Sequence, residues 1–195
     1  MSRKPILVVT SAIGLAFLTV LSGLMTWLYA NEVQSGPFHT DFSLVDDRGE
    51  PIDETVFHGH PALVYFGYTH CPEVCPTTLY EVADWLKRLG PQGQPLKAYF
   101  FTVDPERDTR AVMHNYVHAF SDRITGITGQ PAEMAKVVDG WMIHAAKLPG
   151  GGSNYHMRHT ASLLMVGADG RLKGLLPYGI DRDEALAKIQ SALLR

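Results

Sequence analysis

The sequence predicts an α/β fold, with one sheet covered by helices, preceded by a single transmembrane helix. Two continuous apolar runs of strand length, 62–68 and 98–103, are typical of strands buried on both faces. Helical patterns follow both runs, and this alternation of strands and helices is characteristic of an α/β sheet. The transmembrane helix is predicted because residues 6–30 carry no charged side chain.

The uncharged segment 6–30 is long enough to cross a membrane. As a helix it measures roughly 37 Å, against a hydrocarbon core of about 30 Å. Arg3 and Lys4 precede it and, by the positive-inside rule, keep the amino terminus in the cytoplasm. A cleavable signal peptide is the alternative, but Leu28 is not the small residue that cleavage requires. Residues 1–30 are therefore expected to form a single-pass anchor in the inner membrane, with the remainder in the periplasm.

A linker over residues 31–41 and one domain over residues 42–195 are expected after the anchor. The domain begins with a hairpin, whose strands 42–45 and 51–52 flank the turn 46–49. The elements expected after it are, in order, a strand 62–68, a helix 79–89, a strand 98–103, a helix 112–117, a helix 130–147, a loop 149–154, a hairpin of strands 161–166 and 172–176, and a helix 181–194.

Composition excludes several classes of function. The 17 basic and 20 acidic residues give a net charge of −3, which provides no basic field for nucleic acid. Two cysteines cannot form a disulfide-rich scaffold, and 46% hydrophobic residues exclude a disordered chain. Any chemistry must therefore lie in a few particular residues.

Both cysteines lie where the strand 62–68 meets the following helix. The spacing of Cys71 and Cys75 on a helical turn places them side by side, and the helix amino terminus is expected to make both more acidic than a free thiol. Two adjacent thiolates are soft ligands that select Cu(I) or zinc, and in an oxidising compartment they can form a disulfide. A passive disulfide is the alternative, although closing so short a loop removes little chain entropy.

A site with two thiolates needs at least one more ligand, for which histidine is the candidate. His156 and His159 precede the strand 161–166, which can lie next to the strand that leads into the cysteines. Spacing does not separate these two, and a solvated position remains open for either. His114 and His118 form an i,i+4 pair that is expected to be exposed and without a metal.

Three sequence blocks resemble the Sco/SenC family of membrane-anchored copper proteins, which serve cytochrome c oxidase assembly. The blocks are Tyr65–Leu79 (YFGYTHCPEVCPTTL), Val103–Thr109 (VDPERDT) and Tyr155–His159 (YHMRH). The similarity covers residues 37–194 in order and spacing. It implies a thioredoxin-like fold with an extra amino-terminal hairpin.

The resemblance also implies a site and a function. Residue by residue, the family's copper ligands fall on Cys71, Cys75 and His159, which favours His159 over His156. Asp104 matches an acidic position in the outer shell of the site, and a turn or capping residue is its alternative role. The implied function is that of a metallochaperone for Cu(I) or Cu(II). It would deliver copper to the CuA site of cytochrome c oxidase subunit II or to another copper enzyme, or reduce the cysteines of that site.

A thiol–disulfide oxidoreductase of the thioredoxin type, acting without metal, is the alternative function. An enzymatic role therefore stays open for the pair Cys71 and Cys75. Two features disfavour it: the cysteines are separated by three residues rather than two, and no proline occurs in 158–161, before the strand.

Overall fold

The computed structural model describes residue 14 and residues 17–27, 40–149 and 155–193. The chain divides into one unit of residues 1–36 and another of residues 37–195. Residues 17–27 of the first unit are helical. Among the described residues, no helix combines the length and the apolar character needed to cross a membrane. Most of the predicted anchor, most of the predicted linker and residues 150–154 of the predicted loop lie outside the described residues.

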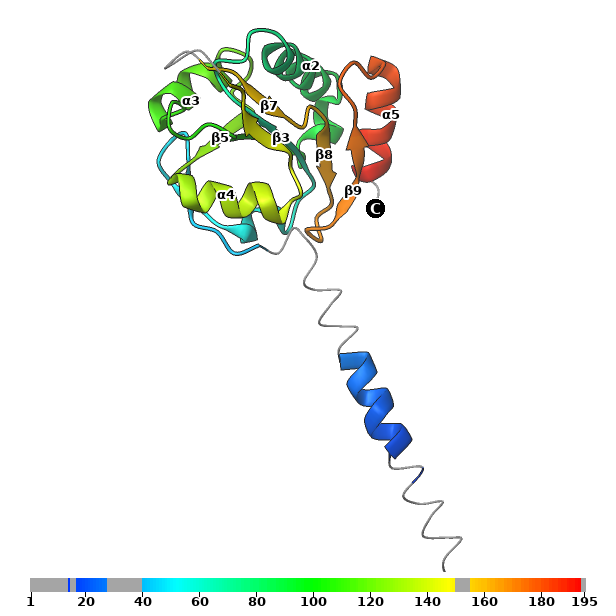
Figure 1. Cartoon of the computed structure of the whole chain (residues 1–195). Coiled ribbons are helices and arrows are strands. Elements are labelled where there is room, and N and C mark those ends of the chain that lie inside the picture. Colours follow the sequence, from blue (N-terminus) through cyan, green and yellow to red (C-terminus); the bar gives the residue numbers. More distant parts are fainter. Residues whose placement is uncertain (1–13, 15–16, 28–39, 150–154, 194–195) are drawn as a thin grey trace, which may run out of the picture. The chain divides into compact units, whose positions relative to one another are not determined.

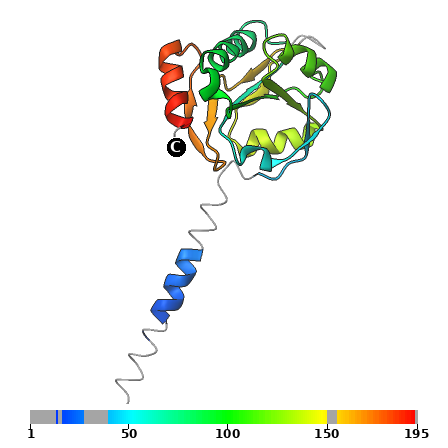
Figure 2. The same cartoon turned by 180° about the vertical axis from the view of Figure 1, so that it is seen from behind.

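The second unit contains a mixed sheet of seven strands and a separate sheet of two (Figures 1 and 2). The strands of the large sheet are β1 (Leu44–Asp46), β2 (Pro51–Ile52), β3 (Ala62–Gly67), β4 (Lys97–Thr102), β5 (Ile124–Thr128), β8 (Leu163–Val166) and β9 (Leu172–Leu176). Their order is β2-β1-β5-β4-β3-β8-β9, with β3, β4 and β5 parallel and the other pairs antiparallel. The small sheet pairs β6 (Ala145–Lys147) with β7 (Met157–His159).

Helices cover both faces of the large sheet. They are α2 (Val74–Arg88), α3 (Arg110–His118), α4 (Pro131–Gly140) and α5 (Arg182–Leu193), with short 3-10 turns at Glu54–Phe57 and Gly90–Gly93. Neighbouring aromatic residues of β4 point to opposite faces, as strand geometry requires. Phe100 packs against Tyr65 and against Tyr116 of α3, whereas Phe101 packs against Trp141, just after α4. Thus α3 and α4 lie on opposite faces, as Figure 1 shows.

The structure confirms the mixed α/β architecture but contains three strands that were not expected, β5, β6 and β7. The predicted helix 130–147 ends at Gly140, and Met142 then adopts a left-handed backbone (φ 53°) that no helix continues through. Residues 145–147 form β6 instead. The expected order also omitted β5, whose sequence Ile-Thr-Gly-Ile-Thr contains no continuous apolar run although the strand lies between β1 and β4.

Candidate metal centre

The loop after β3 brings the two cysteines to the carboxyl end of the parallel strands. β3 ends at Gly67, and the backbone N–H of Cys71 then donates to the Tyr68 carbonyl (3.2 Å). A Cβ atom on Gly67 would lie 2.8 Å from Sγ of Cys75 and 2.7 Å from the Phe100 ring. The absence of a side chain at this position is therefore what allows the Cys75 thiol to approach the sheet.

Cys71 precedes α2 rather than lying on it, which corrects the expectation that both cysteines share a helical turn. The helix begins at Val74, so only Cys75 lies in its first turn. The N–H of Cys75 donates to Sγ of Cys71 (3.4 Å), and the N-cap residue Glu73 makes no side-chain capping bond. The Cys71 sulfur therefore accepts one of the N–H groups that a helix start leaves without a partner.

The two thiols differ in acidity, so the expectation that both are acidified is wrong for Cys75. A hydrogen bond from the Cys75 thiol lowers the pKa of Cys71 well below its usual range, against the opposing effect of burial. Hydrogen bonds from the backbone N–H groups of Cys75 and Glu73 act in the same direction. The pKa of Cys75 is raised by that same hydrogen bond and by burial. The pair therefore consists of a half-buried thiolate and a buried thiol, not joined as a disulfide.

His159 lies against this pair. Its Nε2 is 3.4 Å from Sγ of Cys75, and its Nδ1 is 3.0 Å from the carbonyl oxygen of Thr160. Because a carbonyl can only accept, this contact assigns the proton to Nδ1 and leaves the lone pair of Nε2 facing the cysteines. One ligand atom from each of Cys71, Cys75 and His159 fits within 4.8 Å of the others.

Strand pairing explains how a residue 84 positions after Cys75 reaches it. β8 runs antiparallel to β3, with Val64 opposite Leu164, so the residues that precede β8 lie beyond the end of β3. The β6–β7 pairing then fixes His159 opposite Ala145. The sequence predicted the neighbouring strands but not the small sheet that holds the histidine.

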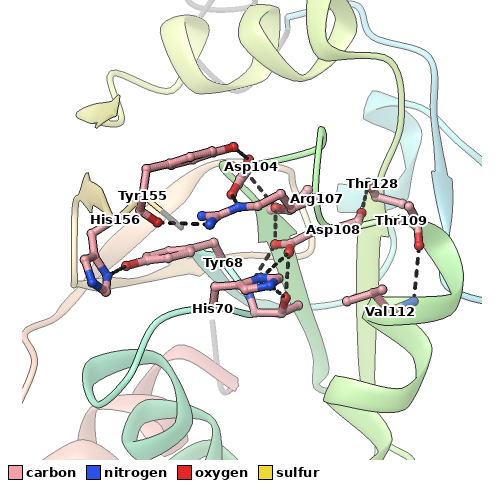
Figure 3. Close-up of polar contacts among 12 residues, drawn as sticks. Tyr68, His70, Asp104, Arg107, Asp108, Thr109, Val112, Thr128, Tyr155 and His156 are labelled. Atoms are coloured by element: carbon pink, nitrogen blue, oxygen red, sulfur yellow. Dashed lines mark hydrogen bonds and ion pairs between the residues drawn. The ribbon is translucent and has the colours of Figure 1, made fainter. Parts of the chain in front are cut away.

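The other histidines near the motif lie elsewhere. His156 is exposed, with its Nδ1 3.5 Å from the hydroxyl oxygen of Tyr68 (Figure 3). His70 contacts Thr69 and lies 3.8 Å from the Asp108 carboxylate. Neither belongs to the group formed by the two cysteines and His159. Of the two histidines that spacing left equivalent, the structure brings His159 to the cysteines.

Two tyrosines that sequence reasoning did not single out surround the histidine. The rings of Tyr65 and Tyr68 meet the His159 ring edge-on, at centroid distances of 6.1 and 5.8 Å. The Tyr65 hydroxyl also donates to Sγ of Cys75 (3.8 Å). Strand alternation was the available signal, because Tyr65 lies two residues before Gly67 and shares its face of the sheet.

Asp104 lies outside the group formed by the two cysteines and His159. Its carboxylate accepts hydrogen bonds from the Tyr155 hydroxyl (2.6 Å) and from Nε of Arg107, and the same guanidinium donates to the Tyr155 carbonyl (Figure 3). The Arg107 guanidinium is 5.9 Å from the Tyr68 ring centre. Asp104 thus reaches His159 through Arg107 and Tyr68. Thr109, not Asp104, caps α3.

Asp108 is a further positioning residue that sequence reasoning missed. Its side chain is fully buried and accepts hydrogen bonds from the backbone and hydroxyl of Thr69 (3.0 and 2.6 Å) and from the hydroxyl of Thr102 (2.6 Å). Its carbonyl accepts from the hydroxyl of Thr128 (2.7 Å). The cysteine loop is therefore tied to β4 and β5 through one buried residue.

These features define a class of protein. A mixed α/β sheet presents a thiolate, a thiol and an imidazole at the ends of its strands, which is a thioredoxin-like fold carrying a site for a soft metal ion or for dithiol chemistry. A family comparison then identifies the chain more closely. The sequence profile of the SCO1/SenC family matches residues 30–194, and the chain belongs to this family.

Individual relatives agree with this membership. The SCO2-like protein of Rickettsia felis is 30% identical over 179 residues, which cover 86% of each chain. The mitochondrial SCO2 homologue of Bos taurus is 36% identical over 133 residues, which cover 67% of this chain and only 50% of that protein.

Solved structures of the family have the same fold. Bradyrhizobium japonicum ScoI with copper bound aligns with a TM-score of 0.73 at 38% identity, covering 78% of this chain and 97% of that one. Yeast Sco1 with copper bound aligns with a TM-score of 0.74 at 27% identity, covering 79% and 87%.

Proposed function

We propose that this chain is a copper metallochaperone in which Cys71, Cys75 and His159 hold one copper ion. The observation that carries the proposal is the convergence of two sulfur atoms and one imidazole nitrogen within 4.8 Å. Thiolates are soft ligands that favour Cu(I), and three donors suit its trigonal coordination, whereas Cu(II) requires a fourth donor. The copper-bound Bradyrhizobium and yeast relatives support copper as the ion.

The site is arranged to pass its ion on. Cys71 and His159 are half-buried and Cys75 is buried, so a partner's ligands can approach from one side as these residues release the ion. The family resemblance favours the CuA site of cytochrome c oxidase subunit II as the recipient, with another copper enzyme as the alternative. Asp104 contributes from the outer shell by fixing Arg107 against Tyr68.

We also propose that the chain is anchored in the inner membrane by residues 1–30, with the copper site in the periplasm. The uncharged segment 6–30 and the basic residues before it support this arrangement. Apolar side chains exposed on residues 17–27, including Phe17 and Trp27, are consistent with it. Mass spectrometry of the protein from its native membrane tests the anchor: an intact amino terminus is expected, and a mature terminus near Asn31 would contradict it.

Titration of the reduced full chain with Cu(I) tests the copper site. We expect one copper ion per chain, with binding lost or much weakened in His159→Ala. His156→Ala is the matched control, because that histidine lies three residues away and outside the cluster. Loss of binding in His156→Ala with retention in His159→Ala would refute the ligand assignment.

A second function, reduction of a partner's disulfide, is favoured by the unequal acidity of the cysteines. The Cys71 thiolate would attack one sulfur of the partner disulfide, giving a mixed disulfide and releasing the other sulfur as a thiolate. Cys75 would then lose its proton to Nε2 of His159 and attack Cys71, which leaves a Cys71–Cys75 disulfide and a partner reduced by two electrons. A chain that binds no copper but reduces disulfides, with slower reduction in its His159→Ala variant, would leave only the metal-free oxidoreductase.

A further inference from the structure

A second group of ligand atoms lies on α3, apart from the cysteines. Nδ1 of His114 and Nε2 of His118 each lie 2.9 Å from the same atom, Oδ2 of Asp47. The two histidines are one helical turn apart, with ring centres 4.3 Å from each other. Asp47 comes from the turn between β1 and β2, so the cluster joins two elements that are distant in sequence.

Buried hydrogen bonds hold the carboxylate in place. The Asp47 side chain is 1% exposed, and its other oxygen, Oδ1, accepts from the backbone N–H of Gly126 (2.9 Å). Both imidazoles therefore meet an oxygen whose position is fixed by β5. The expectation that His114 and His118 are merely exposed is wrong for His118, whose side chain is 17% exposed, and right for His114 at 49%.

His118 also has the outer contact that is usual for a metal-binding histidine. Its Nδ1 lies 2.9 Å from Oδ1 of Asp122, while Nε2 faces Asp47. Metal-binding imidazoles commonly donate their second ring N–H to a carboxylate, which fixes the orientation of the ring. The cluster therefore combines two imidazoles and the Asp47 carboxylate that both contact, with a second carboxylate, Asp122, bound to the other nitrogen of His118.

We propose that Asp47, His114 and His118 form a second metal site, for a divalent first-row transition ion of which zinc is the test case. In a tetrahedral zinc site, ligand atoms about 2.0–2.1 Å from the ion lie about 3.3 Å apart. The 2.9 Å separations from each ring nitrogen to Oδ2 are hydrogen-bond distances, which would widen by a few tenths of an ångström to admit the ion. The half-exposed His114 leaves the remaining coordination positions open to water. With two imidazoles and a carboxylate in place of thiolates, this site discriminates against Cu(I).

The contrasting role for the same three residues is a hydrogen-bonded clamp that holds α3 to the β1–β2 turn without any ion. To separate the two roles, the full chain carrying Cys71→Ser and Cys75→Ser is titrated with Zn²⁺ by calorimetry. This background removes the thiolates, so the result does not depend on the proposed copper site. We expect one Zn²⁺ per chain, with stoichiometric binding lost in His114→Ala and affinity about 10- to 100-fold weaker in Asp122→Asn.

His144→Ala is the matched control, since this histidine is exposed and belongs to neither ligand group; its affinity for Zn²⁺ should be unchanged. Thermal unfolding of the same variants gives a second readout, because an ion that binds only the folded chain raises the melting temperature. Zn²⁺ should raise it in the serine background and not after His114→Ala. The absence of stoichiometric binding in that background, or binding that survives both His114→Ala and His118→Gln, would leave only the clamp.

Discussion

Cys71 and Cys75 differ in acidity because their surroundings differ. Cys71 is half-buried, lies outside the helix and accepts a hydrogen bond from the helix start, whereas Cys75 is buried against Gly67 and Tyr65. A thiolate is stabilised by donors and a thiol by burial, so one proton is retained by the inner cysteine. The outer sulfur is consequently the one that meets a metal ion or a partner first.

The lowered pKa of Cys71 predicts a flat pH profile for its alkylation. In the metal-free, reduced chain, iodoacetamide should modify Cys71 at a nearly constant rate between about pH 6 and about pH 8, whereas an ordinary thiol loses about tenfold per pH unit below its pKa. Cys75→Ala removes the group that donates to Cys71, so the midpoint should move upward. A Cys71 rate that falls tenfold per unit in the unmodified sequence would contradict the assigned thiolate.

Gly67→Ala should disturb the site through packing. The added methyl group would lie 2.8 Å from Sγ of Cys75 and 2.7 Å from the Phe100 ring. We expect a loss of about 1–3 kcal/mol in the free energy of unfolding and a weaker affinity for Cu(I), since Cys75 must move. Denaturant unfolding and copper titration measure the two effects. If the variant matched the unmodified chain in stability and in Cu(I) affinity, the close approach of Cys75 to Gly67 would not be required.

Two strands and a loop meet at Asp108, which explains how the cysteine loop keeps its shape. The residue joins Thr69 of the loop to Thr102 of β4 and Thr128 of β5. Hydroxyl and N–H donors surround its carboxylate, so the charge is compensated although it is buried. The geometry of the site thus depends on Asp108, which joins the loop to β4 and β5 but is not itself a ligand.

Asp108→Asn should destabilise the fold by about 2–4 kcal/mol, because the amide presents a donor to groups that are themselves donors. The matched control is Asp84→Asn, which removes an exposed i,i+4 pair with Arg88 and should cost less than about 1 kcal/mol. Denaturant unfolding of both variants gives the comparison. Equal losses in the two would mean that the buried carboxylate contributes no more than a surface one.

The elements that the sequence failed to predict are those held by tertiary contacts. The buried strands β3 and β4 have continuous apolar runs, and α2 has an amphipathic pattern, so each was predictable from its own residues. β5 contains a glycine and two threonines, and its place in the sheet comes from pairing with β1 and β4. β6 and β7 have three residues each and exist through pairing with one another.

The same distinction separates the parts of the site that were predictable. Cys71 and Cys75 are only four positions apart, so their proximity was predictable from the sequence, although Cys71 precedes α2 rather than sharing its first turn. The choice of His159 over His156 required the family resemblance, since both precede the same strand. Asp47 and Asp108 belong to contacts that only the assembled sheet creates, and no local pattern marked them, whereas strand alternation placed Tyr65 on the same face as Gly67.

The stability of the whole second unit should depend on pH through Asp47 and His118. Burial alone would raise the pKa of Asp47, but hydrogen bonds from His114, Gly126 and His118 outweigh it and lower the pKa. The pKa of His118 is raised, chiefly by its hydrogen bond to Asp122. The Asp47 contribution is therefore lost as pH falls through its folded pKa, and the His118 contribution as pH rises through its own.

Denaturant unfolding in the presence of a metal chelator tests this pH dependence. The His118 contribution should be complete below about pH 6.5, the ordinary value for histidine, and decline above it. His118→Gln should flatten this alkaline decline, while His144→Ala, at an exposed histidine, should leave it intact. A decline of the same size in His118→Gln would assign the effect to other groups.

X-ray absorption of the full chain loaded with one equivalent of Cu(I) examines the proposed copper site most directly. The predicted first coordination shell contains two sulfur atoms and one imidazole nitrogen, supplied by Cys71, Cys75 and His159 of a single chain. The nitrogen contribution should disappear in His159→Ala and persist in His156→Ala. A shell of sulfur atoms alone in the unmodified chain, or a nitrogen contribution that survives His159→Ala, would contradict the proposed site.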